Sequence, residues 1–176
     1  MLAVATVMVA GECTSSGSEG ASTSTAPTDP PSTTAAATSS APTTTATGDP
    51  NIPAAARALT GDAAIAFTNY WIDQLNAAGQ KADPGLIAAL SAPSSCPNCT
   101  AFISNIEKLR AEGKHIKGNL WTVKWSELDS FDMVSQAVVI VRVHQNAVPA
   151  VDSSGSEGSR YKDQTSELAF TLQTLG

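Results

Sequence analysis

TGDAAIAFTNYWIDQLNAAG (residues 60–79) carries the clearest helical pattern in the chain. Thr60 is a residue type that caps helix N-termini, and Gly79 is typical of a helix end. Between them apolar residues recur every three or four positions, at Ala64, Phe67, Trp71, Leu75 and Ala78. This spacing predicts one apolar helix face. Because that face carries two aromatic rings, we expect the helix to lie across a broad surface such as a sheet.

Two further helices are predicted after the first. Asp83-Pro84 combines a capping residue with a proline at the first helical position, which favours a short helix with Leu86, Ile87 and Leu90 facing inward. The third helix follows the Cys96–Cys99 segment and ends near Gly113. Its apolar repeat consists of Phe102, Ile103, Ile106 and Leu109.

Beyond Gly113 the pattern becomes that of strands. Trp121, Val123 and Trp125 alternate with polar residues, so we expect them on one face of a strand. A turn is predicted at Asp129-Ser130, and the strand Met133–His144 is apolar on both faces over residues 137–141, which is typical of a central strand. Asn146–Ser159 is predicted to be a loop, and the last strand to span Tyr161–Leu172. Helices followed by antiparallel strands indicate an α+β fold.

The amino-acid composition divides the chain into three parts. Residues 1–13 form a signal-like segment. Residues 14–50 are almost entirely Ser, Thr, Ala, Pro and Gly, and they contain no aromatic or branched aliphatic residue. Such a segment buries too little apolar surface to fold, so we predict a disordered tether, either unmodified or O-glycosylated. Residues 51–176, about 125 in number, have the size of one globular domain.

The first thirteen residues, MLAVATVMVAGEC, predict export. Their apolar run is shorter than the ~20 residues that span a bilayer, but it fits the ~7–15 residues of a signal peptide. Val9–Cys13 resembles a bacterial lipobox, which implies lipidation of Cys13 and anchoring on the extracytoplasmic face of the cell membrane. Glu12 stands where the lipobox has a small residue, and no Lys or Arg precedes the apolar run. Secretion after cleavage near Ala10 or Gly11, and a cytoplasmic location, are therefore alternatives.

The charge distribution argues against nucleic acid as a partner. The net charge is −6, and every Lys and Arg lies at or beyond Arg57. Four of the sixteen acidic residues precede residue 51, so the predicted domain carries twelve acidic and ten basic side chains. No basic stripe with interleaved aromatic residues is present, although nucleic-acid-binding surfaces typically have one.

Cys96 and Cys99 form a C-x-x-C motif at a predicted helix N-terminus. A helix N-terminus stabilises a thiolate, so thiol-disulfide exchange is one interpretation. No βαβ pattern precedes the motif, and in an exported protein a structural disulfide between the two cysteines is the simpler interpretation. A zinc site would need two further ligands, and His115 and His144 are not at ligand spacing. We therefore predict no metal and no cofactor.

Several features together resemble a known family. The lipobox-like start, the tether, the sequence Ala66–Trp71 and the Ala92-Pro93 pair before the cysteines are similar to actinobacterial lipoproteins of unknown function. The order of elements resembles the cone-shaped nuclear transport factor two-like fold. This resemblance implies three N-terminal helices packed on a curved antiparallel sheet of three to four strands, preceded by the disordered tether. The resemblance implies a location and a fold, but it implies no biochemical activity.

Cone-shaped folds of this kind can enclose an apolar pocket between helix and sheet. The candidate lining residues are Tyr70, Trp71, Trp121, Trp125, Tyr161 and Phe170. An enzyme would need an acid or base there, but the available carboxylates lie on predicted polar faces or turns: Asp73, Asp129, Asp132 and Asp163. Neither histidine belongs to a triad, so no catalytic residue is predicted.

These patterns together predict a non-catalytic envelope lipoprotein. Its C-terminal domain would bind a small apolar ligand or an envelope protein. Two alternatives are an isomerase- or hydrolase-like enzyme that uses the pocket, and a redox protein that uses Cys96 and Cys99.

Overall fold

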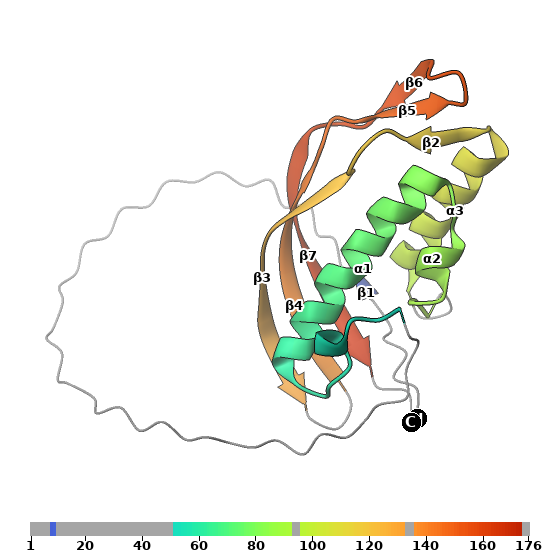
Figure 1. The fold of residues 1–176 in the computed structure, drawn as a ribbon. Helices are drawn as coiled ribbons and strands as arrows, with labels where there is room; N and C mark the ends of the chain where they lie inside the picture. The colour runs from blue at the N-terminus through green and yellow to red at the C-terminus, as the bar shows by residue number, and fades with distance from the viewer. Residues whose placement is uncertain (1–7, 10–50, 93–95, 133–135, 174–176) are drawn as a thin grey trace, which may run out of the picture. The chain divides into compact units, whose positions relative to one another are not determined.

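The computed structural model describes residues 8–9, 51–92, 96–132 and 136–173 (Figure 1). The α+β class predicted from the sequence is confirmed. Every described residue belongs to one compact unit. Cys13 and the predicted tether over residues 14–50 lie outside the described residues. The elements, in chain order, are β1 (Met8–Val9), the 3-10 helix η1 (Ala54–Ala56), α1 (Gly61–Lys81), α2 (Gly85–Ala88), α3 (Pro97–Ala111), β2 (Lys114–Ile116), β3 (Trp121–Asp132), β4 (Gln136–Gln145), β5 (Pro149–Asp152), β6 (Glu157–Arg160) and β7 (Gln164–Gln173).

The first helix follows the sequence pattern closely. The Thr60 hydroxyl oxygen accepts a hydrogen bond from the Ala63 amide at 3.2 Å, as expected of an N-cap. The helix continues two residues past Gly79 and stops where Ala82 adopts a left-handed φ of 50°. Within the segments that the structure describes, no helix has the length and apolar character needed to cross a membrane.

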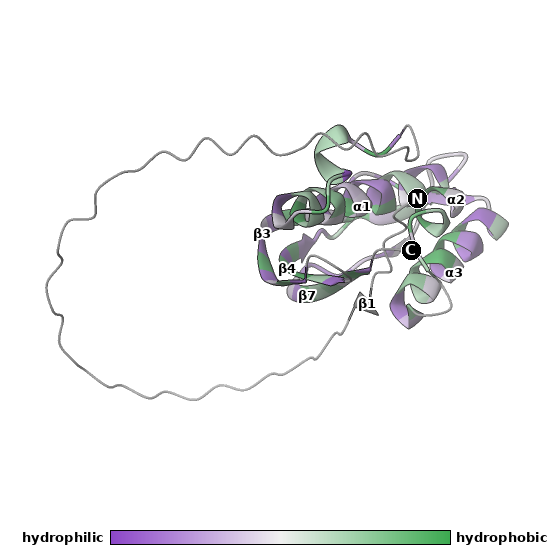
Figure 2. Cartoon of the chain, turned by 90° about the horizontal axis from the view of Figure 1, so that it is seen from below, coloured by the Kyte–Doolittle hydropathy of each residue, from purple (hydrophilic) through white to green (hydrophobic). Residues whose placement is uncertain are grey.

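The larger sheet has the strand order β1-β7-β4-β3, and all of its pairs are antiparallel. The predicted central position of the strand after Met133 is confirmed, since β4 lies between β7 and β3. Val139, Val141 and Val143 are fully buried on one face of β4. Figure 2 shows α1 running along that sheet, with α3 beyond the β1 side.

The structure corrects the predicted face of Trp125. The register between β3 and β4 shifts between Val123 and Trp125, so that Val123 pairs with Val143 and Trp125 with Arg142. The extra residue in β3 is a bulge, which reverses the alternation of side chains. Trp125 therefore lies on the face opposite Val123, where the Arg142 guanidinium sits 5.1 Å from its ring centroid.

Two other sequence predictions are also corrected. Asp129-Ser130 is not a turn, because both residues belong to β3 at a second register shift. The predicted loop Asn146–Ser159 contains β5 and the start of β6, which join β2 in a second antiparallel sheet of order β2-β5-β6. In addition, β1 precedes the helices, so the helices are not the first elements of the fold.

Candidate functional site

Three of the six aromatic residues predicted to line a pocket pack together in the core. Trp71 and Phe170 are 1% and 0% exposed, and their ring centroids lie 5.6 Å apart. Phe102 links Trp71 to Trp121, at centroid distances of 6.0 and 6.2 Å. These edge-to-face contacts are favourable aromatic geometries. We call Trp71, Phe102, Trp121 and Phe170 the aromatic cluster.

The other three predicted pocket residues lie outside this cluster. Trp125 is on the opposite face of the sheet, as described above. Tyr70 packs beside Phe67 at a centroid distance of 6.4 Å. Tyr161 follows β6; its amide donates to the Val148 carbonyl, and burial raises the pKa of its phenol.

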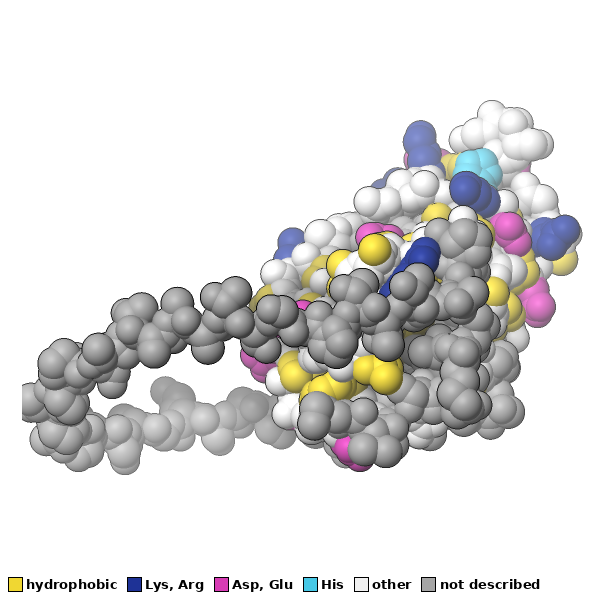
Figure 3. Space-filling view, turned by 60° about the horizontal axis from the view of Figure 1, so that its bottom comes forward, with side chains coloured by type: hydrophobic (Ala, Val, Ile, Leu, Met, Phe, Trp, Pro, Cys, Tyr) yellow, Lys and Arg dark blue, Asp and Glu magenta, His cyan; other side chains and the backbone are white. Residues whose placement is uncertain are grey.

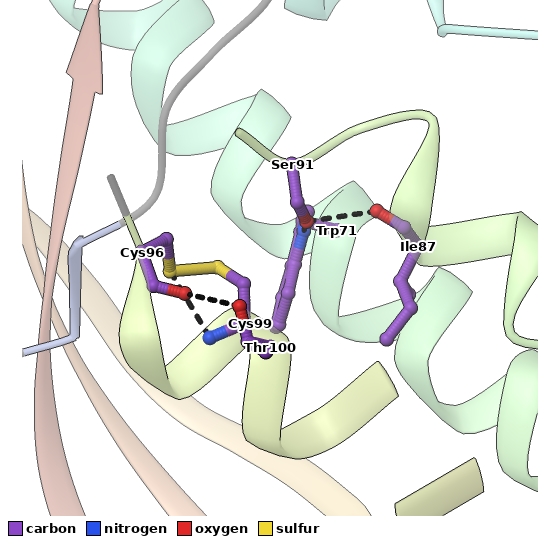
Figure 4. Close-up of a disulfide and its surroundings, with 6 residues drawn as sticks. All are labelled: Trp71, Ile87, Ser91, Cys96, Cys99 and Thr100. Atoms are coloured by element: carbon purple, nitrogen blue, oxygen red, sulfur yellow. Dashed lines mark hydrogen bonds between the residues drawn. A yellow bond between two sulfur atoms is a disulfide. The ribbon is translucent and has the colours of Figure 1, made fainter. Parts of the chain in front are cut away.

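The indole of Trp71 also makes a specific hydrogen bond (Figure 4). Its Nε1 donates to Ser91 Oγ at 3.1 Å, and Ser91 Oγ donates to the Ile87 carbonyl at 2.8 Å. This chain of bonds joins α1 to the end of α2 through a buried serine. Sequence periodicity places Trp71 on the buried face but does not identify Ser91 as its partner.

The two cysteines form the predicted disulfide. Their sulfur atoms lie 2.03 Å apart, and both side chains are fully buried. Cys96 caps α3, since its Sγ accepts from the Cys99 amide at 3.1 Å. The bridge therefore fixes the first turn of α3 next to the Trp71–Ser91 pair (Figure 4).

A hollow of about 310 Å³ lies between α1 and β3, and we call it the α1–β3 hollow. Its lining residues are Asn69, Ile72, Asp73, Asn76, Asn119, Trp121, Thr122 and Val123. The buried Asn76 amide exchanges two hydrogen bonds of 2.8 Å with the backbone of Trp121. Among the described residues, Asn69 Oδ1 and Trp121 Nε1 are buried without a hydrogen-bond partner.

The asparagines of this hollow could have been found in the sequence. Asn69 and Asn76 are seven residues apart and therefore share one face of α1. Asn69 Nδ2 donates to Ser126 Oγ at 3.2 Å, so both asparagines connect α1 to β3. Asp73 contributes the one carboxylate of the lining.

A second hollow, of about 550 Å³, lies where α1 and α3 end beside β2. Its lining is Gln80, Lys81, Ala82, Asp83, Arg110, Gly113, Lys114 and His115. Lys114 Nζ lies 2.8 Å from Glu112 Oε2, and this hydrogen bond lowers the pKa of Glu112. Basic side chains at helix C-termini offset the helix dipole, which gives them a structural role.

No metal centre is formed by the side chains that the structure describes, since no three His, Cys, Asp or Glu residues gather there. His115 lies on β2. His144 lies on β4, with Nδ1 3.1 Å from Thr165 Oγ1 and Nε2 3.4 Å from Asp163.

Three large apolar side chains are exposed in the described part of the chain: Leu59, Leu128 and Phe131. Leu128 lies against Gly61 at the start of α1. Figure 3 shows hydrophobic side chains gathered at this end of the domain.

Comparisons with models of protein families, with curated proteins and with solved structures find no match for this chain. The resemblance to actinobacterial lipoproteins and to the nuclear transport factor two-like fold therefore stays a prediction.

Proposed function

We propose that this chain is an exported envelope protein, anchored by a lipid on Cys13, which binds another envelope protein through residues 51–176 without catalysing a reaction. The observation that carries the proposal is the buried Cys96–Cys99 disulfide. Disulfides persist in oxidising compartments outside the cytoplasm, which agrees with the signal-like segment. Their burial favours a structural role over thiol exchange, since an exchanging sulfur must be reached by a second thiol.

A protein partner fits the domain better than a small apolar ligand does. Small-molecule pockets are mostly apolar and enclosed. The rings of Trp71, Trp121 and Phe170 instead contact one another, directly or through Phe102. Both hollows are open and lined mainly by polar and charged side chains. Binding is therefore expected on the outer surface of the domain.

Metabolic labelling with a fatty-acid analogue in the native host tests the anchor. The wild-type chain is expected to take up the label and to sediment with membranes, and Cys13→Ala is expected to do neither. The matched control is the double variant Cys96→Ala/Cys99→Ala, which changes the other two cysteines and keeps Cys13. Label that persists in Cys13→Ala would overturn lipidation at this residue.

The enzyme alternative is favoured by one observation, the position of Asp73 in the α1–β3 hollow. An acid or base must face the space that a substrate would occupy. The test is turnover of a panel of ester and ketone substrates by wild type and Asp73→Asn, with Asp163→Asn as the control outside the hollow. Turnover that disappears only in Asp73→Asn would favour the enzyme.

Redox function has a separate test on the folded protein. The buried cystine is expected to resist a mild reductant, so that free-thiol titration detects no new thiols at Cys96 or Cys99. Rapid, reversible reduction of the native protein would favour thiol-disulfide exchange.

A further inference from the structure

Apart from the two-residue strand β1, the larger sheet is bounded by β3 and β7, which differ in how their edges are protected. An unpaired strand edge is a template for pairing with another chain, and proteins guard it with bulges and charges. The β3 edge has both, with two register shifts and the charged residues Lys124, Glu127, Asp129 and Asp132. By contrast, β7 pairs with β4 over ten consecutive residues without a shift, and its only charged residue is Glu167. The β7 edge is therefore regular and poorly guarded.

A short piece of the chain already uses this edge. Met8 and Val9 form β1, which pairs antiparallel with β7 in the register Met8 to Thr171 and Val9 to Phe170. β1 also contacts α3. An extended segment thus lies between the β7 edge and α3 (Figure 2). The Cys96–Cys99 disulfide fixes the first turn of α3 (Figure 4).

We propose that the β7 edge beside α3 is a binding site for an extended aliphatic segment of a partner protein, which joins the sheet by strand addition. This inference rests on the proposed function, because removal of the residues before Cys13 during export would take β1 away and leave the edge open. Until that cleavage, Met8 and Val9 would occupy the site in which the partner segment binds.

The side chains of β7 define the chemistry of the partner. Residues directly opposite in an antiparallel pair point to the same face, and Phe170 and Leu172 are both buried on one face of β7, so partner residues paired with them would lie on that buried face. A partner segment would therefore carry aliphatic residues at every second position, with backbone hydrogen bonds providing the sequence-independent part of the affinity.

A second copy of this chain fits the site less well than a single segment. An extended strand, β1, contacts both β7 and α3, so a single strand fits between these two elements. The β7 strand of a second copy would bring its own β4, since β4 is paired along the whole of β7. That neighbouring strand would extend into the space that α3 occupies.

The test uses the processed chain, starting at residue 13 with Cys13→Ser, and a labelled synthetic peptide of residues 4–11, VATVMVAG, with two lysines added for solubility. We expect the peptide to bind the processed chain at least about tenfold more tightly than the full chain, where β1 competes from within the same molecule. Protection of β7 amides from hydrogen exchange on binding would locate the peptide.

Two N-methylated peptides provide the matched control. Neighbouring amides of a strand point to opposite sides, so only one of Met8 and Val9 donates toward β7. Methylation of that amide is expected to weaken binding by about tenfold or more, and methylation of the other to change it little. Equal effects of both methyl groups, or no binding to the processed chain, would overturn the proposal.

Two further outcomes would overturn the proposal. A processed chain that fails to fold would overturn the proposal, because β1 would then be an integral strand. Self-association that the peptide reverses would identify a second copy as the occupant and overturn the proposed partner. None of these measurements depends on lipid or export, so their failure leaves the Cys13 labelling experiment as a separate test of the proposed function.

Discussion

Trp71 combines deep burial with a specific hydrogen bond. Its ring meets those of Phe102 and Phe170, and its Nε1 donates to Ser91. Trp71→Ala removes these contacts and leaves a cavity, so we expect the free energy of unfolding to fall by about 3–5 kcal/mol. Trp71→Phe keeps a ring and loses only the Nε1–H donor, so its loss should be smaller. Urea denaturation monitored by circular dichroism measures both.

Trp125→Ala is the control for this prediction. Trp125 lies half-buried on the opposite face of the sheet, against the Arg142 guanidinium. Its truncation is expected to cost clearly less than that of Trp71. Equal losses for the two tryptophans would contradict the packing described for the aromatic cluster.

Asp152 gives the stability of the β5–β6 connection a dependence on pH. Its Oδ1 accepts from the Ser154 hydroxyl at 2.6 Å and from the Ser154 and Ser156 amides at 2.9 and 3.0 Å. The Ser154 hydroxyl is the main cause of the lowered pKa of Asp152, and the Ser156 amide adds to it. A lowered pKa stabilises the fold above the ordinary value of 3.8, and that stabilisation is lost as the pH falls through the lowered pKa.

Asp152→Asn should therefore be less stable than wild type at neutral pH. The difference in midpoint temperature should shrink as the pH falls below 3.8, because the wild-type carboxyl then becomes protonated in the folded state as well. Thermal unfolding at a series of pH values measures this difference. Ser154→Ala keeps the carboxylate and removes the main donor, so it should show a weaker form of the same effect. A difference that is constant with pH would argue against the predicted linkage.

At the scale of elements, the contact between α1 and β2 depends on a glycine. A Cβ placed on Gly79 would lie 2.7 Å from Ile116 Cδ1, and Ile116 is 5% exposed. Alanine normally stabilises a helix interior relative to glycine by about 1 kcal/mol. Here we expect Gly79→Ala to destabilise the protein instead, since the buried isoleucine has little room to move. Ile116→Val removes Cδ1, so the double variant should be more stable than the sum of the two single changes predicts.

Gly61 is the control for the Gly79 prediction. It also lacks room for a Cβ, because Leu128 lies against it, but Leu128 is 37% exposed and can rotate toward solvent. Gly61→Ala is therefore expected to be tolerated. Denaturant unfolding of the two alanine variants compares the sites, and a tolerated Gly79→Ala with additive effects at Ile116 would refute the close contact.

The helices could be predicted from local sequence because capping residues and apolar periodicity act between residues that are close together in the chain. The Thr60 cap and the apolar period define α1 to within two residues at its end. The strands needed information that local periodicity lacks. The bulge before Trp125 depends on pairing with β4, and the exposed strand β6, with the sequence EGSR, has the composition of a loop.

The candidate sites were also predictable only in part. The Cys96–Cys99 spacing, together with the predicted export and the absence of a βαβ pattern, predicted the disulfide. The six aromatic residues were predicted to line one pocket, but their grouping depends on long-range packing, which brings Phe102 into the cluster and separates Trp125 from it. The bonds between Asn76 and Trp121 join residues 45 positions apart, so no local pattern contains them.

At the scale of the whole molecule, the described hydrophobic core comes entirely from the C-terminal part of the chain. Its buried residues run from Ala64 to Leu172, and Ile52 packs against them. This distribution indicates that residues 51–176 hold the interactions needed for cooperative folding.

A chain of residues 51–176 should consequently unfold in one cooperative transition, with the same dependence on urea as a chain that begins at Cys13. This dependence scales with the surface exposed on unfolding, and both chains contain the whole described core. Only the full chain has β1, whose two residues pair with Thr171 and Phe170, so we expect it to be more stable by at most about 1–2 kcal/mol. Urea unfolding of the three chains provides the measurement. A shallower transition in the 51–176 chain alone would mean that residues 13–50 are part of the cooperative unit, and it would move the domain boundary toward the N-terminus.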